Sequence, residues 1–164
     1  MTRRDTPAEQ LEDLDKEILK TMLDLRGTKM STVSRKIGVS KSTVHNRLKR
    51  LKQGGFIEGM IPMISEEKVK GPITAVSLVS ARYGPGYGKS VGASIARIKG
   101  VWAVYFVLGD IDFIVLIRTR DKDELARVLE ELANIPGVEG SETIMALETV
   151  KEDYVASVKC LLED

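Results

Sequence analysis

The sequence predicts an α+β protein in two parts, three helices followed by a four-stranded sheet with two helices. Up to about residue 53, apolar residues recur every three or four positions, as on the buried face of a helix. Beyond residue 72, segments rich in β-branched and aromatic residues alternate with two helical segments. The charge changes as well. Residues 26–52 contain nine Lys or Arg and no Asp or Glu, whereas residues 60–164 contain 12 basic and 16 acidic residues.

The composition excludes several classes of protein. Of the 164 residues, 30% are charged and 43% are hydrophobic, which is ordinary for a folded chain and unlike a disordered or collagen-like one. Cys160 is the only cysteine and His45 the only histidine, so we expect no internal disulfide, no thiolate cluster and no His-rich metal site. We also predict no metal, no cofactor and no catalytic residues. Because the chain shows neither a signal-peptide pattern nor a membrane-length apolar run, we expect it in the cytoplasm.

The three N-terminal helices form a helix-turn-helix pattern. The first has Leu14 and Ile18 on its apolar face, and its first turn is acidic, which suits the helix dipole. The second is expected near residues 30–37. The third runs from 41 to about 53, after a three-residue turn in which Ser40 is a good N-cap. In this motif the third helix enters the major groove of DNA.

The third helix therefore predicts a binding face for double-stranded DNA. Val44, Leu48 and Leu51 should point inward and leave the opposite side free. An acid-free basic stretch is typical of a partner with many negative charges, whereas solvated helix faces mix both signs. The predicted contacts are His45, Asn46 and Lys49 to base edges, Ser42 and Thr43 to bases or phosphates, Lys41, Arg47, Arg50 and Lys52 to phosphates, and Lys29, Arg35 and Lys36 near the second helix to the DNA backbone.

Two of these residues have an alternative role. Arg47 lies close to the apolar stripe, so it can instead form a structural ion pair with Asp15 or Glu17 of the first helix. His45 is chemically suited to be a metal ligand or a base, although a polar residue facing the groove is the simpler interpretation.

The second part has the element order of a ferredoxin-like βαββαβ sandwich. A tight two-residue turn, Gly109-Asp110, should join its second and third strands. The glycine-rich segment 83–88 lacks the spacing of a phosphate-binding loop and is expected to be a turn. We expect strands at 73–82, 101–108, 111–119 and 138–150, helices at 89–99 and 122–133, a short strand at 56–61 and a final helix within 151–162.

Two of the strands indicate a homodimer. Residues 102–107 and 113–117 are apolar at nearly every position, whereas a sheet with one solvated face should alternate apolar and polar residues. We therefore expect a second copy to cover the face that the helices leave open. The expected organisation is a helix-turn-helix domain at 1–59, a linker at 60–72, the ferredoxin-like domain at 73–150 and a helix or tail at 151–164.

Several short segments occur in a characteristic order and spacing. They are Leu14-Asp15 with Ile18 and Leu19, Val39-Ser40-Lys41-Ser42-Thr43-Val44, Gly55-Phe56-Ile57, Gly109-Asp110-Ile111-Asp112-Phe113 and Ile135-Pro136-Gly137-Val138. Together they resemble the Lrp/AsnC family of leucine-responsive, feast/famine transcription regulators. The resemblance implies a DNA-binding domain followed by a domain for effector binding and assembly, with dimers that often form tetramers or octamers.

The resemblance also implies an effector, an amino acid or a related metabolite bound between dimers. The matching residues are Leu108, Gly109, Asp110, Ile111 and Asp112, and many members have Thr where this chain has Leu108. A turn offers backbone N–H groups to a carboxylate, and an aspartate can pair with an ammonium group. The alternative is a plain hairpin turn with Asp112 as a surface acid.

Three functions therefore compete. The leading hypothesis is a sequence-specific DNA-binding regulator, not an enzyme, controlled by a small molecule or by assembly. An architectural chromatin protein without an effector would carry the same basic face. An enzyme similar to the tetrapyrrole decarboxylases on this fold would need histidine in the second part, and none follows His45.

Overall fold

The computed structural model describes residues 11–27, 29–65, 68, 72–82, 84 and 86–163. The chain divides into two compact units. The helical unit comprises Met1–Met63 with Glu152–Asp164, and the sheet unit comprises Ile64–Lys151. Among the described residues, no helix combines the length and apolar character needed to cross a membrane.

The helical unit contains the expected helix-turn-helix. Its core includes Ile18, Val33 and Val44 from the three helices, and each is at most 1% exposed. Gly38 ends the second helix with φ of 74°, a conformation that glycine adopts without steric cost and that allows the tight turn into the third. The predicted bounds of the second and third helices are confirmed. The helices are α1 (Asp13–Asp24), α2 (Met30–Ile37) and α3 (Lys41–Gln53).

The short strand expected at 56–61 does not form. Gly55, with φ of 76°, reverses the chain just after α3. The backbone N–H groups of Phe56 and Ile57 then donate to the carbonyl of Leu51, at 2.9 and 3.3 Å. These residues close the end of α3 and do not extend as a strand, because their donors already satisfy the helix terminus.

The C-terminal segment belongs to the helical unit, whereas the sequence suggested a separate helix or tail. It forms α6 (Tyr154–Lys159) and a short 3₁₀ helix, η2 (Cys160–Leu162). Leu162 is 8% exposed, and the ammonium group of Lys159 lies 2.7 Å from the Oδ1 atom of Asp24 in α1. This pairing lowers the pKa of Asp24 and raises the pKa of Lys159, because each charge stabilises the other.

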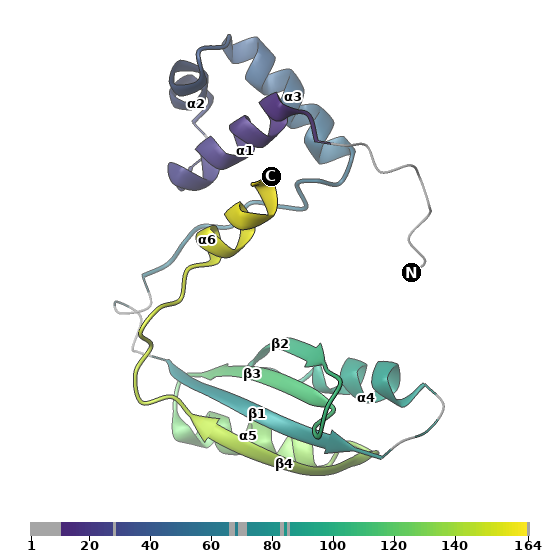
Figure 1. Ribbon diagram of the computed structural model, residues 1–164. Helices are drawn as coiled ribbons and strands as arrows, with labels where there is room; N and C mark the ends of the chain where they lie inside the picture. The colour runs from purple at the N-terminus through teal and green to yellow at the C-terminus, as the bar shows by residue number, and fades with distance from the viewer. Residues whose placement is uncertain are drawn as a thin grey trace. The chain divides into compact units, whose positions relative to one another are not determined.

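The sheet unit has the predicted ferredoxin-like order βαββαβ. Its strands pair antiparallel in the order β2-β3-β1-β4, and α4 and α5 lie on the same face of the sheet (Figure 1). All four strands are shorter than predicted, and α4 begins and ends earlier than the expected 89–99, while α5 matches its predicted range. The elements are β1 (Ile73–Ala81), α4 (Tyr87–Ile95), β2 (Val101–Phe106), β3 (Phe113–Thr119), α5 (Lys122–Ala133) and β4 (Val138–Met145).

The two faces of the sheet differ in burial. Toward the helices, side chains such as Val79, Phe113 and Val115 are fully buried against α4 and α5. The open face, on the other side, is also apolar. Trp102 is 43% exposed and Ile144 54%, and Val76, Leu78, Ile114 and Leu116 are half-buried there. An apolar face that stays in contact with water is typical of an association surface.

Candidate nucleic-acid interface

The N-terminus of α3 gathers hydrogen-bond donors that suit an anion. Ser40 caps the helix, and its Oγ accepts the Thr43 backbone N–H at 3.0 Å. The same oxygen lies 2.7 Å from the Ser42 hydroxyl and 2.8 Å from that of Thr43. Three hydroxyls thus gather at the positive end of the helix dipole, where backbone N–H groups also remain available. Helix N-termini of this kind bind phosphate oxygens in DNA complexes.

Most of the predicted base-reading residues share one exposed side of α3. Val44, Leu48 and Leu51 are buried, as predicted, with exposed fractions of at most 5%. The opposite side consequently faces away from the core of the helical unit. Lys41, Ser42, His45, Asn46 and Lys49 are exposed, and Thr43 is half-buried at its flank.

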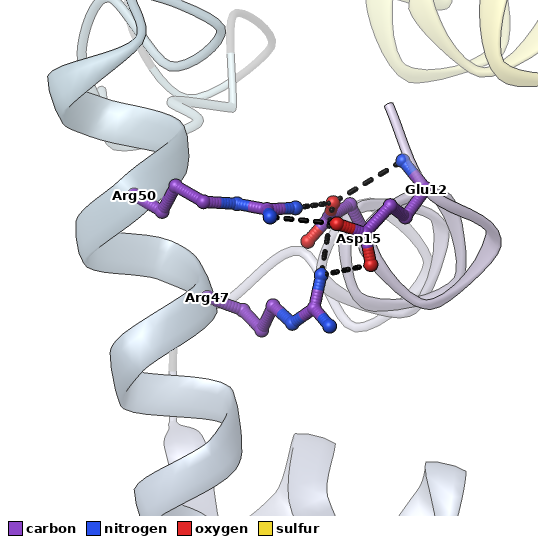
Figure 2. Close-up of polar contacts among 4 residues, drawn as sticks. All are labelled: Glu12, Asp15, Arg47 and Arg50. Atoms are coloured by element: carbon purple, nitrogen blue, oxygen red, sulfur yellow. Dashed lines mark hydrogen bonds and ion pairs between the residues drawn. The ribbon is translucent and has the colours of Figure 1, made fainter. Parts of the chain in front are cut away.

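Arg47 and Arg50 point in another direction, toward α1 (Figure 2). The Nη1 atom of Arg47 lies 2.5 Å from Oε2 of Glu12 and 3.5 Å from Oδ2 of Asp15. Arg50 places Nη1 2.7 Å from Oε1 of Glu12, and its Nη2 pairs with Asp15. Asp15 is fully buried and also accepts the Glu12 backbone N–H at 3.2 Å. We call these four residues the arginine clamp.

The arginine clamp changes the expected role of its two arginines. The structural ion pair considered for Arg47 does form with Asp15, but the second acid is Glu12, whereas Glu17 was the other candidate. Arg50 was expected only at phosphates. Its guanidinium lowers the pKa of Glu12, and the pKa of Arg50 is raised in return. Both arginines fasten α3 to α1, so their charge is already compensated within the protein.

The sequence did contain a signal for this arrangement. Glu12 and Asp15 are three residues apart, as are Arg47 and Arg50, so each pair lies on one side of its helix, one turn apart. Since both pairs flank the apolar stripes that pack against each other, they face one another. The ion pair was considered for Arg47 and missed for Arg50, because basic residues on a recognition helix are expected to contact DNA.

The basic residues of α2 lie at its two ends. Lys29 is the N-cap residue, and Arg35 and Lys36 occupy the last turn, where positive charge suits the helix dipole. All three side chains are exposed. The ammonium of Lys36 lies 3.9 Å from Oδ2 of Asp24, a weak surface pairing that leaves the group accessible.

The predicted effector turn is a longer loop. Strand β2 ends at Phe106 and β3 begins at Phe113, so the residues between them form a six-residue connection in place of the two-residue hairpin turn. Leu108 is completely exposed, Gly109 and Asp110 are exposed, and Ile111 is half-buried. The Val107 N–H donates to the Asp112 carbonyl at 2.9 Å, which closes the loop.

Asp112 is not the surface acid that a plain hairpin turn would carry. It is 7% exposed, and both of its carboxylate oxygens accept hydrogen bonds. Oδ2 accepts the Ala81 backbone N–H at 2.7 Å, and Oδ1 accepts the Tyr87 hydroxyl at 3.0 Å. Asp112 therefore joins the loop to the end of β1 and the start of α4.

These features define a class of protein, a DNA-binding regulator with a helix-turn-helix and a separate α+β domain. Comparison with protein families supports both halves. Residues 11–58 match the family model of winged helix-turn-helix DNA-binding domains, and residues 74–156 match the Lrp/AsnC ligand-binding domain. The chain belongs to the Lrp/AsnC family of transcriptional regulators.

Individual relatives agree with this assignment. The HTH-type transcriptional regulator FL11 of Pyrococcus horikoshii is 32% identical over 149 residues, covering 91% of this chain and 97% of the relative. AsnC of E. coli superposes with a TM-score of 0.75 over 87% of this chain and 96% of that one, at 22% identity. A Neisseria meningitidis regulator in complex with L-Met superposes with a TM-score of 0.78 over 89% of this chain and 96% of that one, also at 22% identity. Because the relatives are regulators, the decarboxylase alternative is set aside.

Proposed function

We propose that this chain reads specific DNA sites through α3, as a homodimer or a larger assembly, under the control of a small molecule. The observation that carries the DNA part is the acid-free helix whose exposed side presents Ser42, His45, Asn46 and Lys49. Asn46 has the donor and acceptor pair that matches adenine, and Lys49 donates to guanine. The lysines at 41 and 29 and the basic end of α2 supply phosphate contacts.

The arginine clamp sharpens the test of this interface. We expect Lys49→Gln to weaken binding to the protein's own promoter by about tenfold, the cost of one lost base contact. Arg50→Gln should act through stability and leave the salt dependence of binding nearly unchanged, because this charge is compensated by Glu12 and Asp15. Lys89→Gln, an exposed site in the sheet unit, is the matched control.

Fluorescence anisotropy at several salt concentrations measures these effects. If Lys49→Gln binds as the wild type does, the assignment of α3 as the recognition element fails. The same assay with a random duplex tests the architectural alternative, since a sequence-specific regulator should prefer its site by about 10³-fold or more at physiological salt.

The open face of the sheet supports the proposed dimer. Its apolar side chains retain exposed fractions as high as 54%, and stable interfaces commonly bury about 800 Å² on each partner, an area that a four-stranded sheet can supply. A second copy would exclude water from this surface. A dimer would also present two recognition helices to two half-sites of an operator.

The loop at 107–112 supports a proposed effector site. The solved complex with L-Met shows that a protein of this fold binds an amino acid, and we propose an amino acid or a related metabolite here. Leu108, Gly109 and Asp110 are exposed, so the loop offers backbone N–H groups to a carboxylate and one aspartate to an ammonium group. Asp112 and the half-buried Ile111 would shape the loop from inside.

A thermal-shift screen of the twenty amino acids tests this site. We expect one or a few to raise the melting temperature, since a ligand that binds only the folded state stabilises it. Asp110→Asn should abolish that shift without changing the melting temperature of the free protein. A ligand shift that survives Asp110→Asn, or the absence of any shift, would contradict the assignment.

A further inference from the structure

Glu12 is the exposed acid of the arginine clamp. Its side chain is 52% exposed, whereas that of Asp15 is fully buried. Its Oε1 atom lies 2.7 Å from Nη1 of Arg50, and its Oε2 atom lies 2.5 Å from Nη1 of Arg47. Ion pairs that remain open to water add little to stability, because the solvent screens them. Since Asp15 also pairs with both arginines, the fastening of α3 to α1 depends mainly on the buried acid.

The two arginines border the side of α3 that we propose to read DNA. Arg50 comes four residues after Asn46, so it lies one turn further along the same side of the helix. Arg47 stands in the same relation to Thr43. Even within the clamp, the side chains of Arg50 and Arg47 are 45% and 27% exposed. An arginine released at either position would lie at the edge of the recognition side, where phosphates flank the groove.

Glu12 removes this positive charge from the surface that meets DNA. The clamp contains two arginines and two acids, so it has no net charge. Without the Glu12 carboxylate it would carry one positive charge, because Asp15 balances only one arginine. The hydrogen bonds from Arg50 and Arg47 lower the pKa of Glu12, so this acid stays charged at neutral pH. A further cation here would add a phosphate contact, which strengthens binding to DNA of any sequence.

An additional cation favours random DNA more than an operator. At an operator, base contacts from Asn46 and Lys49 would fix α3 in one orientation, in which the clamp arginines face α1 (Figure 2). On random DNA no base contact fixes the helix, so the protein is free to turn and slide toward additional phosphates. An arginine released from the clamp would therefore strengthen the random complex more than the specific one.

We propose that Glu12 is a specificity-determining residue, which keeps Arg47 and Arg50 away from phosphates and so limits binding to random DNA. The inference rests on the proposed function, in which α3 reads the operator. The two acids of the clamp then have separate roles. Asp15 holds α3 in position from the interior, and Glu12 sets how much positive charge the protein presents beside the recognition side.

Glu12→Gln tests the proposal on the full chain, because it removes the charge and keeps the size of the side chain. Fluorescence anisotropy at several salt concentrations compares the protein's own promoter with a random duplex. We expect affinity for the random duplex to rise by about threefold or more. Its logarithm should fall more steeply with the logarithm of the salt concentration, by about 0.9, the value for one added phosphate contact. The promoter should gain less, so the preference for it falls.

Further variants identify the charge that is responsible. Glu17→Gln removes the same charge from the same helix outside the arginine clamp, and this matched control should leave both affinities nearly unchanged. In the double variant Glu12→Gln with Arg50→Gln the clamp is neutral again, so the gain on the random duplex should be lost. Circular dichroism confirms that each variant is folded. Because Glu12 is the N-cap residue of α1, Glu12→Ser, a favourable N-cap, serves if Glu12→Gln is not folded.

Three results would overturn the inference. They are a Glu12→Gln variant that binds the random duplex no better than the wild type, equal gains on the two duplexes, and a gain that persists in the double variant. Lys49→Gln separates this failure from that of the proposed function. If Lys49→Gln weakens promoter binding while Glu12→Gln has no effect, α3 reads DNA and Glu12 has only a structural role. If neither variant changes binding, the proposed interface is wrong as well.

Discussion

Each unit of the protein contains a buried aspartate, and the two are held in different ways. Asp15 in the helical unit faces two guanidinium groups and one backbone N–H. Asp112 in the sheet unit accepts hydrogen bonds from a backbone N–H and a tyrosine hydroxyl. In the first case charge is balanced by charge. In the second, a carboxylate is held by neutral donors.

The comparison shows how each unit prepares its functional surface. In the helical unit the ion pairs join two helices, so that the recognition side of α3 is presented by a rigid support. In the sheet unit Asp112 organises a loop whose exposed residues we propose as the effector site. Both aspartates are buried, and each supports a segment for which we propose a binding role.

The largest effect is expected from removing the charged centre of the arginine clamp. Asp15→Ala should lower the free energy of unfolding by about 2–4 kcal/mol, because two arginines lose a buried partner. Chemical denaturation measures it. Glu17→Ala, an exposed acid on the same helix, is the matched control and should change stability by less than about 0.5 kcal/mol. Equal effects of the two variants would mean that the arginine clamp contributes no stability.

A smaller effect is expected at Asp112, whose hydrogen-bond donors are neutral groups. Asp112→Asn puts an amide donor where two donors already converge, and we expect a loss of about 1–2 kcal/mol. Tyr87→Phe removes one of these hydrogen bonds and should cost about 1 kcal/mol. Asp110→Asn on the exposed part of the same loop is the control. If Asp112→Asn is as harmless as Asp110→Asn, the support that we assign to Asp112 is wrong.

The sequence predicted best those elements whose signals are local. The bounds of α2, α3 and α5 follow from apolar spacing and from caps such as Ser40 and Asp121, which accept backbone N–H groups within their own helices. The open apolar face was also anticipated, because alternation along a strand is a property of consecutive residues.

The errors occur where a residue finds a partner far away in the chain. Asp112 bonds to Ala81 and Tyr87, and no local pattern announces either contact. Arg50 meets Glu12 from 38 residues away. In each case two functions were compatible with the residue type, and only the tertiary fold decides which donor and acceptor meet.

The smallest effect is expected at the ion pair between Lys159 of the C-terminal segment and Asp24 of α1, whose strength should depend on pH. The lowered pKa of Asp24 means that its contribution is present above its ordinary pKa of 3.8 and is lost as the pH falls through the lower folded value. The raised pKa of Lys159 means that its contribution is present below 10.5 and is lost as the pH rises through the higher folded value. The contact should therefore be constant between about pH 5 and 9 and weaken at both extremes.

A fluorophore on the exposed Cys160, the only cysteine in the chain, reports on this contact beside Lys159. We expect its anisotropy to fall at both pH extremes in the wild type. In Lys159→Met the acid and alkaline changes should both disappear, because the pair that produces them is gone, and the anisotropy at neutral pH should be lower. Lys151→Met is the matched control. If the pH profile of Lys159→Met equals that of the wild type, the ion pair with Asp24 does not hold the segment.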